Sequence, residues 1–250
     1  MKVLITGGGG FIGSRLATAL LERGTLGGRR IEQLVLADQV TPRAELMSDA
    51  RVALRVGKLD AQCESLGREN FDGVFHLASA VSGECEADFD LGLRSNLDTT
   101  RALLDALRAA TGRGTPAPRF VFSSSVAVFG PDPSVPLPAL VGDDTLTTPK
   151  TSYGTHKLMC EHLIADYGRK GYVDGRSARL MTVTVRPGKP NGAASSFFSG
   201  IVREPLAGVE AICPVSPEVS HPLTSAARTV EGLIAVYEAS VEQLGGRLAL

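Results

Sequence analysis

A tyrosine and a lysine four residues apart are the residues of this chain best suited by type and spacing to proton transfer. Tyr153 and Lys157 lie in "SYGTHK", within a segment, 152–170, that has the pattern of a helix. A spacing of four places both side chains on one helix face. A cation beside a phenol stabilises the phenolate, so this tyrosine could act as a general base or acid. Because the pair alone is a frequent pattern on helical surfaces, it needs further support from the chain.

Three consecutive serines give that support. Ser123, Ser124 and Ser125 end the apolar run "RFVFSSS" at 119–125, which has the composition of a buried strand. A hydroxyl at the carboxyl end of such a strand could hold a substrate oxygen near Tyr153. The three serines, the tyrosine and the lysine together predict a site for acid–base chemistry on a hydroxyl or carbonyl group.

A glycine-rich turn near the amino terminus predicts a second kind of site. In "TGGGGFIG", Gly7, Gly10 and Gly13 follow an apolar run and open an amphipathic segment, 11–23. Glycine allows a tight turn and a close approach of backbone to a pyrophosphate, and the free N–H groups of the next helix face the negative charge. The position of the turn, between a strand and a helix, favours dinucleotide binding over a simple structural turn.

An acidic residue lies where the same interpretation requires one. The second apolar run, "QLVLAD", ends in Asp38. A carboxylate there can accept hydrogen bonds from the ribose hydroxyls of an adenosine and repels a 2′-phosphate. Asp38 therefore favours NAD over NADP as the cofactor, although it could also merely begin a loop.

The elements that would position these residues alternate along the chain. Short apolar runs without polar alternation are typical of strands buried on both faces of a parallel sheet, and helical patterns lie between them. We therefore predict an α/β fold with a Rossmann-type doubly wound parallel sheet. The predicted strands are 2–6, 33–38, 51–56, 73–78, 119–125 and 180–185, and the predicted helices are 11–23, 85–110, 152–170, 197–206 and 224–240. A proline-rich loop at 131–149 has the length of a functional loop.

The composition excludes several other classes of protein. The 250 residues carry 26 basic and 27 acidic side chains, with no basic stripe typical of nucleic-acid binding. No apolar run has membrane-spanning length, and the N-terminus lacks the pattern of a signal peptide. The cysteines have no metal-binding spacing, so we predict no metal site and interpret them as reduced, buried thiols of a cytoplasmic protein. They are Cys63, Cys85, Cys160 and Cys213.

Taken in order, the motifs resemble the extended short-chain dehydrogenase/reductase family, also called the NAD-dependent epimerase/dehydratase family. The matching segments are "TGGGGFIG", "HLAS", Asn96 in "SNLDTT", "FSSSVAVFG" and "YGTHK", and they run from Met1 to about Arg186. The resemblance implies a Rossmann domain over 1–186 with bound NAD. It implies that Ser125 polarises the substrate oxygen, that Tyr153 transfers the proton and that Lys157 binds the nicotinamide ribose.

The resemblance also implies the remaining residues of the cofactor site. One departure concerns the adenine, because Lys58 stands where the family usually has an aspartate. The implied cofactor-binding residues are Gly7, Gly10, Phe11, Ile12, Gly13, Asp38, Leu59, Leu77, Ala78, Ser79, Asn96, Tyr153, Lys157 and Pro187.

Residues 187–250 resemble the family's substrate domain, and we expect this region to be small and truncated relative to the family. The family's common substrates are nucleotide-diphosphate sugars, but the usual Tyr-Gly-Pro stretch and the acid pair of the dehydratases are absent; Val126 and Ala127 follow Ser125. The segments "SGE-EADFD", "RPGKPN" and "SSFFSGI-REPLAG" instead resemble a branch of NAD-dependent dehydrogenases that oxidise the 2-hydroxyl of a four-carbon sugar acid, D-erythronate.

This narrower resemblance predicts a 2-oxo acid as the product, with Tyr153 as the general base. The carboxylate of such a substrate needs a cation or several hydrogen-bond donors. The candidate substrate-binding residues are Ser82, Ser125, Lys189, Asn191, Ser195, Ser196 and Arg203.

Two other functions stay open from the sequence. One is an epimerase or reductase of nucleotide-diphosphate sugars within the same family. The other is a non-catalytic protein that responds to NAD, against which Ser125, Tyr153 and Lys157 argue. The resemblance further implies a homodimer that associates through the segments 85–110 and 152–170.

Overall fold

A six-stranded parallel sheet forms the centre of the computed structural model, which describes residues 1–188 and 192–250. The strands lie in the order β5-β4-β1-β6-β7-β8. The chain therefore runs outward from β1 in one direction, returns, and runs outward in the other, as in a Rossmann fold. The strands are β1 Lys2–Thr6, β4 Gln33–Asp38, β5 Val52–Val56, β6 Gly73–His76, β7 Arg119–Ser125 and β8 Asp174–Leu180.

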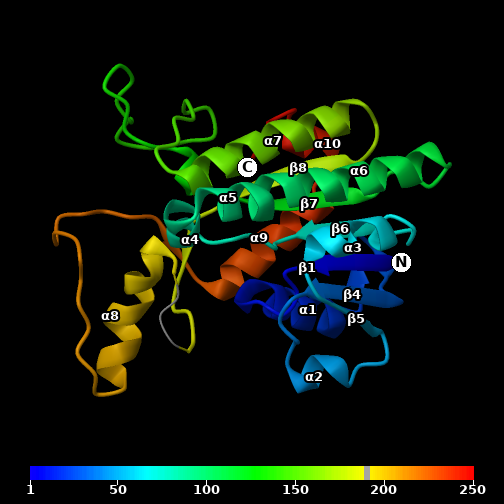
Figure 1. Ribbon diagram of the computed structural model, residues 1–250, viewed down its shortest axis with the longest axis horizontal. Helices are drawn as coiled ribbons and strands as arrows, with labels where there is room; N and C mark the ends of the chain where they lie inside the picture. Colours follow the sequence, from blue (N-terminus) through cyan, green and yellow to red (C-terminus); the bar gives the residue numbers. More distant parts are fainter. Residues whose placement is uncertain (189–191) are drawn as a thin grey trace.

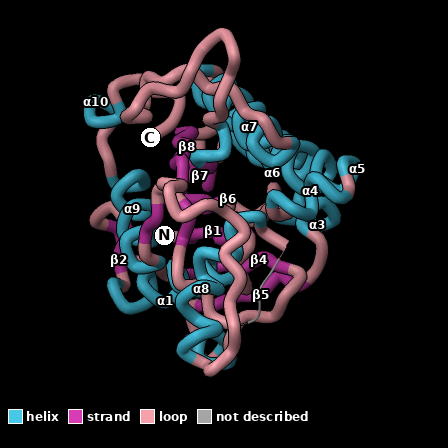
Figure 2. The backbone as a smooth tube through the Cα atoms, turned by 90° about the vertical axis from the view of Figure 1, so that its left-hand side faces the viewer, coloured by secondary structure: helices cyan, strands magenta, loops and turns pink. Residues whose placement is uncertain are grey.

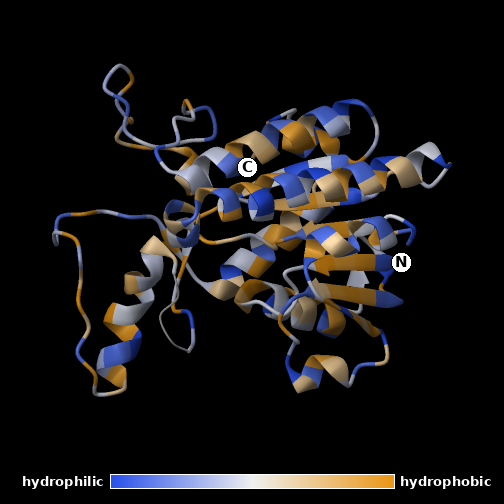
Figure 3. Ribbon diagram, viewed as in Figure 1, coloured by the Kyte–Doolittle hydropathy of each residue, from blue (hydrophilic) through white to orange (hydrophobic). Residues whose placement is uncertain are grey.

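Helices cover both faces of this sheet, as Figure 2 shows. Helices α1 (Phe11–Arg23) and α9 (Ala226–Glu238) pack on one face, where alternate strand residues such as Val3 and Ile5 point. Helices α3 (Leu59–Leu66), α6 (Thr99–Gly112) and α7 (Ser152–Arg169) pack on the other face, which receives Leu4. Because both faces are buried, the middle residues of the central strands are apolar on both faces, and Figure 3 shows β1 and β4 largely in the hydrophobic colour. The predicted fold class is confirmed.

One predicted strand is wrong in position. The sixth strand of the sheet is β8, which ends at Leu180, where the predicted strand begins. The sequence of β8, "DGRSARL", contains charged residues that hide its buried character. Thr182–Val183 instead forms a short strand, β9, that pairs with β10 (Leu223–Thr224) outside the main sheet.

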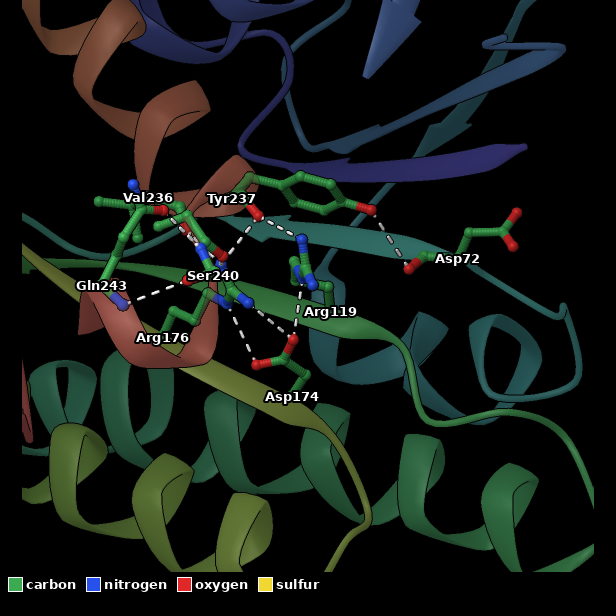
Figure 4. A network of polar contacts seen from close by, with 9 residues as sticks. Asp72, Arg119, Asp174, Arg176, Val236, Tyr237, Ser240 and Gln243 are labelled. Carbon is green, nitrogen blue, oxygen red and sulfur yellow. Dashed lines mark hydrogen bonds and ion pairs between the residues drawn. The ribbon is translucent and has the colours of Figure 1, made fainter. Parts of the chain in front are cut away.

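Figure 4 shows why a charged strand can be buried here. The side chain of Arg176 is completely buried, and its Nη1 donates to the carbonyl oxygens of Val236, Tyr237 and Ala239 at 2.7, 2.9 and 2.7 Å. The same guanidinium forms an ion pair with Asp174 at 2.9 Å. Arg176 thus caps the carboxyl end of α9, whose last carbonyl groups have no partner within the helix. The cap fixes α9 to the edge of the sheet.

The predicted helix 85–110 is divided into several pieces. It comprises α4 (Ser82–Ala87), α5 (Phe89–Gly92), a π-helical turn (Leu93–Asp98) and α6. Helix α7 was predicted almost to the residue, and α8 (Phe197–Leu206) and α9 also form where they were predicted. Short elements without a clear sequence pattern were missed: α2 (Ala44–Met47), α3, α10 (Val241–Leu244) and the hairpin of β2 (Thr25–Leu26) and β3 (Arg29–Arg30).

The chain after β8 first leaves the sheet and then returns to it. Helix α8 and the segment that follows it stand away from the sheet in Figure 1, whereas α9 returns to pack against α1, β7 and β8. At the end of the chain, Leu250 exchanges backbone hydrogen bonds with β8, at 2.7 Å to the N–H of Arg179 and 2.9 Å to the carbonyl of Ser177. None of the helices in the described parts of the chain is long and apolar enough to cross a membrane.

All four cysteines are free. Three of them are buried, as predicted, but Cys213 is exposed, which corrects that expectation. Cys213 lies in the segment after α8, outside the hydrophobic clusters on the two faces of the sheet.

Candidate active site

The glycine turn between β1 and α1 is packed so closely that side chains are excluded from it. A Cβ atom on Gly13 would lie 2.0 Å from the carbonyl oxygen of Gly7, and one on Gly7 would lie 2.8 Å from the backbone nitrogen of Ala78. Gly7 also has a φ of +73°, which favours glycine. Helix α1 begins directly after Gly10, and no side chain caps its N-terminus. The turn therefore presents bare backbone and a helix N-terminus, an arrangement that fits a pyrophosphate.

Asp38 is held against this turn. Its Oδ2 accepts a hydrogen bond from the backbone N–H of Gly9 at 2.9 Å, and its Oδ1 accepts one from Val40 at 3.1 Å. A carboxylate oxygen can accept more than one hydrogen bond. Asp38 thus has a fixed orientation and remaining acceptor capacity at the edge of the glycine turn. The glycine turn and Asp38 together fit a bound dinucleotide.

Helix α7 and strand β7 bring the three predicted catalytic side chains together. The Lys157 Nζ lies 5.4 Å from the centre of the Tyr153 ring and donates to the carbonyl oxygen of Ser123 at 2.8 Å. Lys157 is buried, with 2% of its surface exposed. Ser125 ends β7, and its Oγ accepts a 3.1 Å hydrogen bond from the N–H of Ala127.

A second contact between the same two elements lies beside the first. Ser124 donates to the buried carboxylate of Glu161, and Arg179 from β8 binds that carboxylate at 3.0 and 2.7 Å. Glu161 is thereby neutralised within its own ion pair. In the described parts of the chain, Lys157 has no carboxylate partner, so its positive charge remains available to the groups around Tyr153.

Ser125, Tyr153 and Lys157 line a cleft of about 560 Å³ at the carboxyl ends of the strands, whereas Glu161 and Arg179 lie outside its lining. Parallel α/β folds bind ligands at this edge. Of the described residues that line the cleft, none is acidic, whereas Lys157 and Arg186 are cationic. The cleft is therefore electrostatically suited to anionic ligands.

Buried polar contacts support the floor of the cleft. His76 lies between Thr6 and Thr100, with Nδ1 2.6 Å from one hydroxyl oxygen and Nε2 2.9 Å from the other. Burial lowers the pKa of His76 to about 3, and the charge of Lys157 acts in the same direction.

Asn96 accepts a 2.7 Å hydrogen bond from the N–H of Ala80 and donates to the carbonyl of the same residue at 3.3 Å. Asn96 thus orders the loop after β6 from behind.

The structure brings most of the predicted site residues to one cleft. Those that line it are Gly7, Gly10, Phe11, Ile12, Gly13, Leu77, Ser79, Ser82, Ser125, Tyr153, Lys157 and Ser195. Predicted residues that lie outside the lining are Asp38, Leu59, Ala78, Asn96, Pro187, Ser196 and Arg203. Lys189 and Asn191, both predicted to bind substrate, lie outside the described residues.

Two basic side chains of the cleft, Arg186 and His221, were not among the predicted site residues. Arg186 lines the cleft together with Tyr153. His221 also lines it, stacked on Phe198 with 4.7 Å between ring centres and bound to the hydroxyl of Thr182 at 2.7 Å. Arg186 directly precedes "PGKPN", and a search for the cation nearest the end of the sheet, in place of Lys189, could have found it.

The comparison with known families agrees with this fold and this cleft. The model of the NAD dependent epimerase/dehydratase family matches residues 3–240. The chain belongs to this family, and NAD is its cofactor.

Individual relatives define the class of enzyme more closely. The D-erythronate dehydrogenase of Cupriavidus necator is 49% identical over 255 residues, which cover 99% of this chain and 75% of that protein. The D-erythronate dehydrogenase of Haemophilus influenzae is 46% identical, over 94% of this chain and 71% of that protein. With these relatives, the chain is an NAD-dependent dehydrogenase.

A solved structure shares almost the whole fold. The nucleoside-diphosphate-sugar epimerase from Agrobacterium tumefaciens superposes with a TM-score of 0.91 and 45% sequence identity, over 100% of this chain and 72% of that one. The architecture described above is thus also found in a crystal structure of the family.

Proposed function

We propose that this chain oxidises the 2-hydroxyl group of a short sugar acid, D-erythronate or a close analogue, to the 2-oxo acid. The observation that carries the proposal is the arrangement of Tyr153, Lys157 and Ser125 in a cleft with no acidic residue among its described lining. Two D-erythronate dehydrogenases among the relatives support the same substrate class.

The glycine turn and the N-terminus of α1 would hold the pyrophosphate of the cofactor, and Asp38 would accept hydrogen bonds from its adenosine ribose. A phosphate on that ribose would meet the Asp38 carboxylate, which favours NAD over NADP. When bound, the oxidised nicotinamide supplies the acceptor for the hydride that leaves carbon 2 of the substrate.

The side chains of this protein would manage the proton and the orientation of the substrate. The Ser125 hydroxyl donates to the substrate oxygen and holds it beside Tyr153. The Tyr153 phenolate takes the hydroxyl proton as the C2–H bond breaks and the C2–O bond becomes a carbonyl. Lys157, buried without a carboxylate partner among the described residues, stabilises the phenolate. In sum, the 2-hydroxy acid and NAD⁺ give the 2-oxo acid, NADH and one proton.

The region 187–250 would provide the far side of the substrate site. Ala193, Ala194, Ser195 and His221 line the cleft opposite the glycine turn and the catalytic helix. The backbone N–H of Ala194 donates to the Ser82 hydroxyl at 3.0 Å, which joins this region to the loop after β6. These contacts support a substrate-binding role for the C-terminal part of the chain.

A second candidate is an epimerase that acts on nucleotide-diphosphate sugars. Its support is the solved epimerase structure with a TM-score of 0.91. Epimerisation and oxidation would begin with the same removal of hydride and proton, so the catalytic residues alone cannot separate the two activities. The substrate must separate them.

The test is the formation of NADH, followed by absorbance, with purified protein, NAD⁺ and a panel of four-carbon aldonates and UDP-sugars. We expect NADH with D-erythronate or a stereoisomer and no turnover of the UDP-sugars. NADH with no aldonate, together with epimerisation of a UDP-sugar, would replace the proposal by the second candidate.

A further inference from the structure

Arg186 differs from every other arginine of similar burial in the described parts of the chain. Six other arginines are buried or half-buried, and each has a carboxylate partner within 3 Å. Arg186 is half-buried and has none. Its Nε donates to the carbonyl oxygen of Val183 at 3.2 Å, and among residues 1–188 and 192–250 its two terminal nitrogens have no hydrogen-bond partner.

Such an arrangement is costly unless an anion completes it. Burial lowers the pKa of the Arg186 guanidinium, which expresses the loss of hydration of its charge. An arginine fork binds a carboxylate through two parallel hydrogen bonds, and the energy of such a pair is larger where water is excluded. The cleft provides that setting, because Arg186 lines it together with Tyr153 and no described lining residue is acidic.

Helix α8 holds the backbone of Arg186 from both sides. The Ser199 hydroxyl accepts a 2.9 Å hydrogen bond from the N–H of Arg186, and the Arg203 guanidinium donates to its carbonyl oxygen at 2.7 Å. Ser199 is buried, and its hydroxyl oxygen lies 3.3 Å from that of Thr184, so α8 also contacts the residue that follows β9. Arg203, predicted to bind substrate, contacts Arg186 and Glu204 instead.

We infer that Arg186 binds the carboxylate of the substrate, and that Ser199 and Arg203 act as positioning residues that hold Arg186 in the cleft. The inference rests on the proposed function and adds a means of selecting the substrate. A 2-hydroxy acid whose carboxylate is paired with Arg186 presents its adjacent carbon and hydroxyl group toward Tyr153. A neutral polyol of the same length would leave the guanidinium unpaired, so the site would discriminate against it.

The test compares D-erythronate with the neutral polyol erythritol in the wild type and in Arg186→Met, Arg186→Lys and Ser199→Ala. Arg186→Met is expected to lower kcat/KM for D-erythronate by roughly 10²-fold or more, as for truncation of one partner of a buried charged pair. Arg186→Lys keeps the charge but loses the fork, so an intermediate loss is expected. Ser199→Ala is expected to raise the KM for D-erythronate more than it lowers kcat. Arg228→Met, an exposed arginine on α9, is the control.

The readout that excludes simple misfolding is NADH affinity. The chain contains no tryptophan, so enhancement of NADH fluorescence reports binding without interference from that residue. The affinity for NADH is expected to be unchanged in all variants. If the wild type oxidises D-erythronate and Arg186→Met has the same KM and the same preference over erythritol, the inference is wrong and the proposed function stands.

A calorimetric titration of D-erythronate into the NADH complex tests the carboxylate site without requiring turnover. If the wild type oxidises no aldonate, the proposed oxidation fails, but the carboxylate site is still measured. Binding by the wild type that is lost in Arg186→Met supports the site, and an absence of binding by the wild type overturns it.

Discussion

The ammonium group of Lys157 donates a 2.8 Å hydrogen bond to the backbone carbonyl oxygen of Ser123, which lies two residues before Ser125 in β7. This bond fixes α7 against the carboxyl end of β7, where Ser125 lies. The contact of Ser124 with Glu161 fixes the same helix one turn further on. The two contacts fix α7, which carries Tyr153, against the strand that carries Ser125, and both residues line the cleft.

Replacement of the proposed base should remove turnover but not cofactor binding. In Tyr153→Phe the ring remains and the phenol oxygen is lost, so kcat is expected to fall by about 10²- to 10⁴-fold. NADH should still bind, because the glycine turn, the N-terminus of α1 and Asp38 are unchanged. Tyr167→Phe is a matched control, because this second tyrosine of α7 donates to Asp105 outside the cleft. Wild-type kcat in Tyr153→Phe would contradict its role.

The choice of cofactor should depend on the charge of Asp38. Asp38→Asn keeps the size of the side chain and removes its negative charge. The preference for NAD over NADP, measured as the ratio of kcat/KM values, is expected to fall by about 10- to 100-fold, the range for hydrogen bonds to charged groups. Asp60→Asn, at an exposed position on α3, is the control. An unchanged ratio in Asp38→Asn would show that the carboxylate does not select the cofactor.

The stability of the fold should depend on the buried arginine that caps α9. Arg176→Met removes three hydrogen bonds to carbonyl oxygens and leaves Asp174 with Arg119 as its remaining partner. The free energy of unfolding, measured by urea denaturation, is expected to fall by about 3–5 kcal/mol. Arg228→Met removes an arginine from the exposed face of the same helix and should leave it unchanged. Equal midpoints for the two variants would contradict the capping role.

Stability should also fall on mild acidification. The pKa of His76 in the folded chain is about 3, below its ordinary value of 6.5, and burial likewise lowers the pKa of His156 and His221. Between these two values the unfolded chain binds more protons, so the free energy of unfolding decreases as the pH falls below about 6.5. A fully buried histidine contributes at most about 1.4 kcal/mol per pH unit.

The variant His76→Gln separates this contribution from that of other groups. Glutamine can still bond Thr6 and Thr100 but does not titrate. Denaturation measured from about pH 6 to about pH 4 should show a smaller pH dependence for His76→Gln than for the wild type. Replacement of the exposed His162 should leave that dependence unchanged. The same slope in His76→Gln and the wild type would exclude His76 as its source.

The parts of the fold that depend on apolar periodicity were predictable from the sequence. Strands β1 and β4 carry uninterrupted apolar runs, and α7 has a clear helical pattern. Strand β8 was misplaced because its sequence is charged, and the hydrogen bonds that allow Arg176 to be buried come from distant residues, the carbonyl groups at the end of α9. Sequence proximity carries no information about such contacts, so the strand was assigned to the apolar run beside it.

The site was predictable to a similar degree. The glycine spacing and the Tyr153–Lys157 pair are local patterns, so they can be recognised from the sequence alone. The sequence places Arg186 directly after a predicted strand, but its half-burial and the lack of a carboxylate near it among the described residues come only from the structure. Arg203 lies 17 residues further along the chain, and only the structure reveals that it contacts the backbone of Arg186.

The most direct test of the proposed reaction is the fate of the hydrogen on carbon 2. D-erythronate with deuterium at carbon 2 is incubated with the wild-type protein and NAD⁺, and both products are analysed by mass spectrometry. The account predicts deuterium in the nicotinamide ring of NADH and a four-carbon 2-oxo acid without deuterium at carbon 2. NADH without deuterium, or a product oxidised at carbon 3, would contradict it.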